Sequence, residues 1–117
     1  MSNFTPLVEK EYEFDGDTIK VVFSRMLRKD MLTVLPTFLK LSKEEEGTDE
    51  FNLLINDVLN TLVDILPGSI KSLEGLTDSK GEPISIETVT SEMYFMQLTV
   101  MIAMDLIKES GVPGGKD

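Results

Sequence analysis

The sequence predicts an α+β fold that is mainly α-helical, with an N-terminal β-hairpin followed by three helices, the last one long. Apolar residues alternate with polar ones over residues 8–23, and later recur every three or four positions. The chain has 117 residues, of which 41% are hydrophobic and 27% are charged. This composition excludes a disordered chain and a membrane protein. We expect one domain over residues 1–110 and a flexible C-terminal tail over residues 111–117.

The β-hairpin is predicted from strict alternation on both sides of a turn. The apolar members of the alternation are Tyr12, Phe14, Ile19, Val21 and Phe23. Asp15 and Gly16 lie between the two runs, and an Asp-Gly pair readily adopts the positive φ that a tight hairpin turn requires. A calcium loop needs further oxygen ligands at set spacings, and none follow these residues. We therefore assign the pair to a turn.

The first predicted helix follows a short basic stretch. Asp30 can cap a helix whose apolar face carries Met31, Val34, Leu35, Phe38 and Leu39. Pro36 stands inside this pattern. Because proline removes an interior hydrogen bond and clashes with the preceding turn, we expect the helix to kink or restart there.

The second helix is predicted over residues 49–66, after the acidic stretch 42–50. Its apolar positions form one broad stripe, ended by Pro67 and Gly68. Residues 69–84 are less regular, with a possible short strand near residues 70–73 and a turn at residues 78–81. Ser85 can then cap the long third helix, predicted over residues 86–110 with Gly111 as its C-terminal stop.

The third helix has two apolar faces. At 100° per residue, one stripe consists of Ile86, Val89, Met93, Met96, Val100, Met104 and Ile107. We expect this stripe to face the core. The opposite face carries Phe95, Leu98, Ile102 and Leu106. This face is either covered by the hairpin or free to bind another molecule. These four residues are the candidate partner-binding site.

The methionines of this helix are the second notable feature. Met93, Met96, Met101 and Met104 have flexible, polarisable side chains that suit adaptable apolar binding surfaces, and that equally serve as core filler.

The composition predicts no catalytic site, no metal site and no cofactor. The chain has no cysteine and no histidine, and its serines have no partner of the triad type. It also lacks a glycine-rich phosphate loop. We therefore expect a protein that is not an enzyme. The net charge of −10 repels phosphate backbones and anionic lipids, so neither nucleic acid nor a membrane surface is an expected partner.

Three segments resemble a known family. They are the strand sequence IKVVF at 19–23, the junction RMLRKDML at 25–32 and, most closely, GLTDSKGEPISIE at 75–87, followed by the YFM at 94–96. In this layout the chain resembles the tail assembly chaperones of long-tailed bacteriophages over nearly its full length.

The resemblance implies a protein that acts during assembly and is absent from the finished virion. It would bind the tape measure protein and the tail tube protein in the host bacterial cytoplasm, and keep the tape measure soluble until tube subunits polymerise around it. A homo-oligomer is a further possible state. The alternative is a small structural tail protein, or a head-tail completion protein, that remains in the particle.

Overall fold

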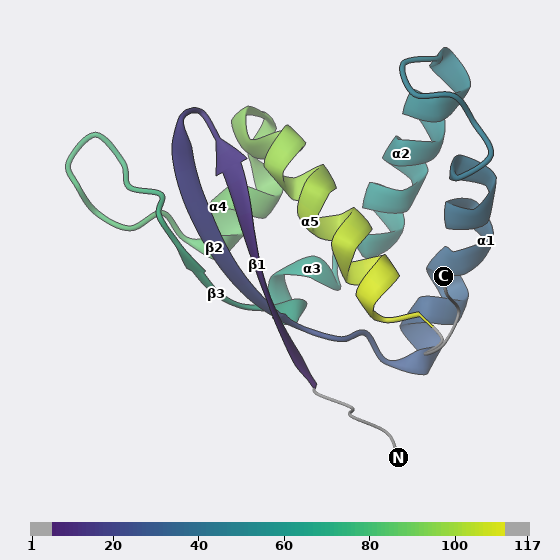
Figure 1. The fold of residues 1–117 in the computed structure, drawn as a ribbon, viewed down its shortest axis with the longest axis horizontal. Coiled ribbons are helices and arrows are strands. Elements are labelled where there is room, and N and C mark those ends of the chain that lie inside the picture. The colour runs from purple at the N-terminus through teal and green to yellow at the C-terminus, as the bar shows by residue number, and fades with distance from the viewer. Residues whose placement is uncertain (1–5, 112–117) are drawn as a thin grey trace.

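The structure, a computed structural model, describes residues 6–111 and has an α+β fold of the expected class (Figure 1). The strands are β1 (Leu7–Phe14), β2 (Asp17–Ser24) and β3 (Ile70–Glu74), and the 3₁₀ helix is η1 (Met93–Phe95). The α-helices are α1 (Arg28–Leu41), α2 (Asp49–Leu62), α3 (Leu66–Ser69), α4 (Ile86–Ser91) and α5 (Met96–Glu109). The predicted tail lies, apart from Gly111, outside the described residues.

The predicted hairpin is confirmed. β1 and β2 pair antiparallel from Leu7↔Ser24 to Phe14↔Asp17, so the turn consists of Asp15 and Gly16 alone. Both residues have positive φ, 52° and 84°, as a two-residue hairpin turn requires. The short strand expected near residues 70–73 is confirmed as β3, which pairs antiparallel with β2 and completes a three-stranded sheet of order β1-β2-β3.

The helical hairpin α1–α2 departs from the sequence prediction at its helix boundaries. α1 begins with Leu27 as its N-cap and no side-chain cap, so the expected cap at Asp30 is wrong; that residue lies in the first turn. α1 also continues through Pro36 without restarting. α2 is capped by Thr48, whose Oγ1 accepts a hydrogen bond from the Phe51 amide at 3.2 Å. It ends at Leu62, before the predicted residue 66.

The long third helix of the prediction is broken. Ser85 caps it as expected, accepting from the Thr88 amide at 3.1 Å, but the first segment, α4, ends at Ser91. Glu92 then adopts an extended conformation before η1 and α5 begin. The buried Thr99 hydroxyl bonds the Val89 carbonyl at 2.8 Å and the Phe95 carbonyl at 3.0 Å. It thereby holds α4 against the start of α5, which lets Val89 reach the core.

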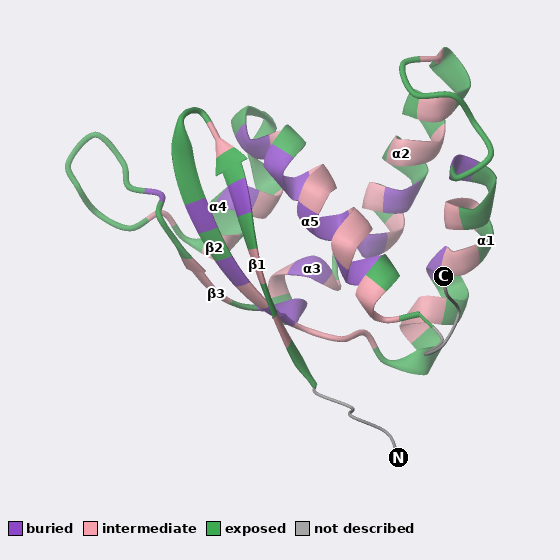
Figure 2. Ribbon diagram, in the orientation of Figure 1, coloured by how far each residue is buried: buried purple, intermediate pink, exposed green. Residues whose placement is uncertain are grey.

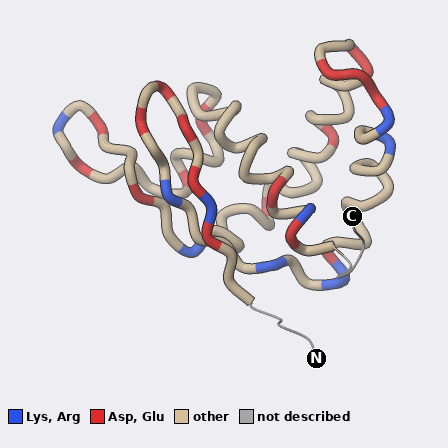
Figure 3. Tube along the Cα trace, in the orientation of Figure 1, with Lys and Arg blue, Asp and Glu red and all other residues tan. Residues whose placement is uncertain are grey.

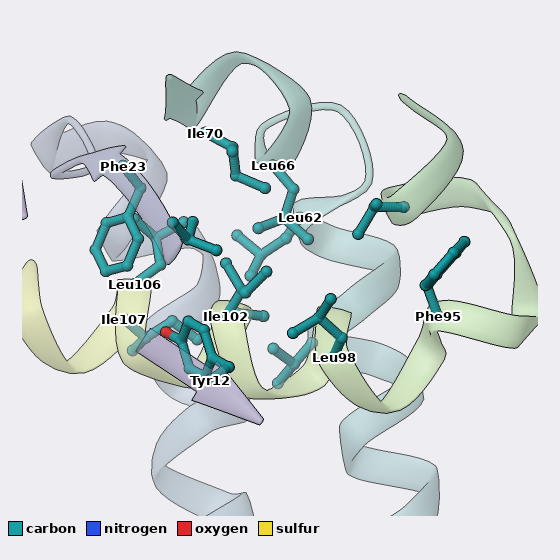
Figure 4. Close-up of a cluster of buried hydrophobic side chains, with 14 of the residues drawn as sticks. Tyr12, Phe23, Leu62, Leu66, Ile70, Phe95, Leu98, Ile102, Leu106 and Ile107 are labelled. Atoms are coloured by element: carbon teal, nitrogen blue, oxygen red, sulfur yellow. The ribbon is translucent and has the colours of Figure 1, made fainter. Parts of the chain in front are cut away.

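The core lies between the sheet and the helices, with α5 at its centre (Figures 1 and 4). α5 packs against β1 on one side and α2 on the other. Figure 4 shows side chains from several elements converging on the inner face of α5. They come from the sheet, α2 and α3, and include Tyr12, Phe23, Leu62, Leu66 and Ile70.

Candidate functional site

The partner-binding face predicted from the sequence is part of the core. Phe95 is 6% exposed, and Leu98, Ile102 and Leu106 are 0% exposed. The sheet contacts α5 on one side and α2 contacts it on the other. Their side chains pack against this face, so it is covered within the chain. The prediction that these four residues form a free binding surface is therefore wrong, and their burial supports the fold instead.

The opposite side of α5 is only partly covered. We call it the methionine face and define it as Met96, Val100, Met101 and Met104, all of which are half-buried. Met101 and Met104 also pack against the core. Figure 2 shows buried, half-buried and exposed positions alternating along α5, which lies between the sheet and α2. Gln97 and Lys108 lie exposed along the same side. Met93, just before α5, is 78% exposed.

The core assignment of this stripe is accordingly wrong in part. Val89 and Ile107 are buried as predicted, and Ile86 and Met104 are half-buried and pack against the core. Met96 and Val100 are only half-buried, and Met93 is exposed. The signal that separates the two faces is side-chain type, since Leu and Ile gather on the covered face and three of the four residues of the methionine face are methionine. Flexible thioether side chains suit a surface that must fit a partner, whereas branched side chains with few rotamers suit a fixed core.

The helical hairpin α1–α2 adds a second apolar surface. Leu32, Leu39 and Leu53 are exposed, and Phe38 and Phe51 are only half-buried. Figure 1 shows the end of this hairpin that carries its connecting loop projecting away from the sheet. A depression at that end is lined by Lys40, Lys43, Glu44, Glu50, Leu53 and Leu54.

A polar cluster fixes the position of the C-terminal half of α5. The Tyr12 hydroxyl donates to Asp105 Oδ2 at 2.7 Å, and Lys10 forms an ion pair with Glu109 at 3.0 Å. Arg25 Nη1 donates to the Glu109 carbonyl oxygen. Burial first, and then the hydrogen bond to Asp105, raise the pKa of Tyr12 well above its usual range. These contacts tie α5 to β1 and to Arg25, the residue that follows β2, so the methionine face is held at a fixed angle.

The tip of the β-hairpin meets η1 at one end of the methionine face. Phe14, Tyr94 and Phe95 form an aromatic cluster with ring centroids 5.0 to 5.8 Å apart. The Tyr94 hydroxyl donates to Asp15 Oδ2 at 2.8 Å, across 79 positions of sequence. Sequence reasoning missed this contact, because it assigned Asp15 to a turn and Tyr94 to a continuous helix.

Over residues 6–111, no group of three or more His, Cys, Asp or Glu side chains is placed to hold a metal ion. In the same residues no helix is long and apolar enough to cross a membrane. Comparisons with family models, curated proteins and solved structures find no match to this chain.

Proposed function

We propose that the protein is a tail assembly chaperone of a long-tailed bacteriophage. It binds the tape measure protein and tail tube subunits in the host bacterial cytoplasm and keeps the tape measure soluble until the tube forms. It is absent from the finished virion. The proposal rests on the resemblance of residues 19–23, 25–32 and 75–87 to that family, and the observation that carries it is the open methionine face on α5.

The physical basis is a match between this face and a helical client. A long helix with exposed apolar stripes binds by laying its apolar side against an adaptable apolar surface. Methionine side chains adjust to different client side chains along such a stripe. This property suits a chaperone that must bind client segments of differing sequence. The net charge of −10 keeps the complex soluble while the client is bound.

Self-association is proposed as part of the same function. The exposed leucines of the α1–α2 hairpin, Leu32, Leu39 and Leu53, offer apolar area that a second copy could cover. Light scattering across a range of concentrations tests this. A mass that stays at 13.1 kDa at every concentration would rule out a homo-oligomer.

Co-expression with the tape measure protein of the same phage tests the chaperone function. The chain should keep the tape measure in the soluble fraction and co-purify with it. Replacing Val100→Glu together with Met104→Glu should abolish both effects while the circular dichroism spectrum is retained, because both side chains are half-buried and glutamate is compatible with a helix.

The matched control replaces Asn56→Glu and Asn60→Glu, which lie exposed on α2 at the same spacing. This control should behave as wild type. Loss of client solubility in the control as well would show that added charge, rather than the methionine face, is responsible. Mass spectrometry of purified virions completes the test: presence of the chain at fixed stoichiometry would contradict the proposal and favour a structural tail or completion protein.

A further inference from the structure

A depression at the tip of the β-hairpin has a composition unlike that of the methionine face. It lies where the β1–β2 turn meets η1 and the first turns of α5. It is lined by two aromatic residues, two acidic residues, a glutamine and a methionine, which are Glu13, Phe14, Asp15, Tyr94, Gln97 and Met101. Apolar and anionic groups therefore share one concave surface. The alternation of β1 directs the Glu13 side chain to the face of the sheet opposite Phe14, where it meets Thr18.

The aromatic part of this surface is rigid although it is exposed. Tyr94 is 66% exposed, yet its ring packs edge-on against Phe95 at 5.0 Å and against Phe14 at 5.8 Å. Phe95 itself is anchored in the core. The hydrogen bond from the Tyr94 hydroxyl to Asp15 fixes the ring at its other end. An exposed ring held at several points loses little entropy when a partner binds.

The exposed charged side chains at this end of the molecule are acidic. Glu13, Asp15, Asp17 and Glu92 are all exposed, and in the part of the chain that the structure describes none of them forms an ion pair with Lys or Arg. Figure 3 shows acidic residues along both strands near the hairpin tip, with the basic residues of the hairpin further from it.

The carboxylates of Glu13 and Asp15 already accept hydrogen bonds from neutral hydroxyls. Glu13 accepts from Thr18 at 3.1 Å and Asp15 accepts from Tyr94 at 2.8 Å. A carboxylate has about four acceptor sites, so each retains capacity for a further donor.

We infer that this depression binds an arginine or lysine side chain presented by an apolar segment of a partner protein. The aliphatic stem of that side chain lies on Phe14 and Met101, and its cationic head lies at the Tyr94 ring beside the Asp15 carboxylate. A cation over an aromatic ring beside carboxylates combines attraction to the ring with charge-assisted hydrogen bonds. The identity of the partner as the chaperone's client rests on the proposed function, but the recognition chemistry does not.

The charge complementarity decides the occupant. A purely apolar segment would leave the carboxylates without a counter-charge, and an acidic segment would be repelled by them. Leu, Ile or Phe flanking the cation would be placed against Met93, which is the most exposed of the large apolar side chains in residues 6–111.

The test uses two synthetic amphipathic peptides that differ only in charge, one built from leucine, alanine and arginine and the other with glutamine in place of arginine. Binding is followed by the ¹⁵N and methyl NMR signals of the full chain. The arginine peptide should shift Tyr94, Gln97 and Met101, and the glutamine peptide should not. Binding should weaken as ionic strength rises to about 1 M, where the Debye length falls to about 3 Å.

Two matched double variants locate the site. Glu13→Gln with Asp15→Asn removes two negative charges from the hairpin tip, while asparagine at position 15 still tolerates the positive φ and still accepts from Tyr94. Glu44→Gln with Glu46→Gln removes the same charge from the exposed loop before α2. The first variant should weaken binding of the arginine peptide roughly 3- to 10-fold, and the second should leave it unchanged.

Equal weakening by both variants would show that net charge alone attracts the peptide, and would overturn the inference. Shifts confined to the α1–α2 hairpin, equal binding of the glutamine peptide, or no binding of the arginine peptide would do the same. If the tape measure co-purifies normally with the Glu13→Gln/Asp15→Asn variant while the arginine peptide still binds wild type at this site, the recognition chemistry stands and only its assignment to the client fails.

Discussion

Truncating neighbouring side chains on opposite faces of α5 tests which face holds the fold together. Ile102→Ala and Met104→Ala remove the same number of side-chain heavy atoms from one helix, two positions apart. Ile102 is fully buried, whereas Met104 is half-buried on the methionine face. Both substitutions slightly favour helix formation, so propensity does not separate them.

The expected magnitudes follow from burial. At about 0.8 kcal/mol for each buried methylene group, plus the cavity that a closed core leaves behind, Ile102→Ala should cost about 3 kcal/mol. Met104→Ala should cost about 1 kcal/mol, because its side chain is already partly hydrated and leaves no closed cavity. For a chain of this length, 1 kcal/mol corresponds to roughly 4 °C in Tm. The two variants should therefore melt about 12 °C and about 4 °C below wild type.

Thermal unfolding followed by circular dichroism, with urea unfolding as a second probe, measures both differences. An equal loss of stability in the two variants, or a larger loss for Met104→Ala, would show that the methionine face is the core face. It would refute the assignment of the open surface on which the proposed function depends.

The remaining predictions concern the contacts that position α5 and the sheet. Tyr12→Phe should cost about 1 to 2 kcal/mol in urea unfolding, since Asp105 loses its buried donor. The pKa of Tyr12 is raised in the folded protein, so the extra stability of wild type over this variant is complete below about pH 10, where unfolded tyrosine begins to ionise, and declines at higher pH. An unchanged stability difference between wild type and variant at pH 9 and pH 11 would contradict the raised pKa. Thr99→Val should cost about 1 to 2 kcal/mol and increase amide exchange in α4, as its hydroxyl no longer bonds the Val89 carbonyl; unchanged exchange would show that the break in the helix is held elsewhere. Gly75→Ala should destabilise the protein more than Gly16→Ala, although both glycines have positive φ. A Cβ at position 75 would collide with the Thr18 backbone carbonyl, whereas a Cβ at position 16 meets no neighbouring atom. Equal melting temperatures for the two variants would count against that close approach.

The elements that could be predicted from the sequence are those whose signal is local. The hairpin follows from alternation around Asp15 and Gly16, and the start of α2 follows from one continuous apolar stripe after the acidic stretch 42–50. The Thr48 cap of α2 and its end at Leu62 were not predicted. The start of α1 was misplaced because a good capping residue, Asp30, stood within a helix that begins earlier without a side-chain cap.

The break at Glu92 and the facing of α5 depend on tertiary contacts and could not be predicted this way. No proline or glycine marks the break, and the bond that holds it joins Thr99 to a carbonyl ten residues away. Because the two apolar faces of this helix have similar width, the periodicity alone does not predict which of them is buried. The positions of the sheet and α2 on the two sides of α5 decide it, and these depend on contacts between distant parts of the chain. The hairpin-tip depression was missed for the same reason.

The most direct test of the proposed function is ¹³C-methyl NMR of the seven methionines with and without the tape measure protein. If α5 presents its methionine face to the client, the Met96, Met101 and Met104 methyl signals should shift or broaden on complex formation. Met26 and Met31, which lie outside α5, one just before α1 and one in its first turn, serve as internal controls and should be unaffected. Unchanged signals of the three α5 methionines in a complex that demonstrably forms would contradict the account.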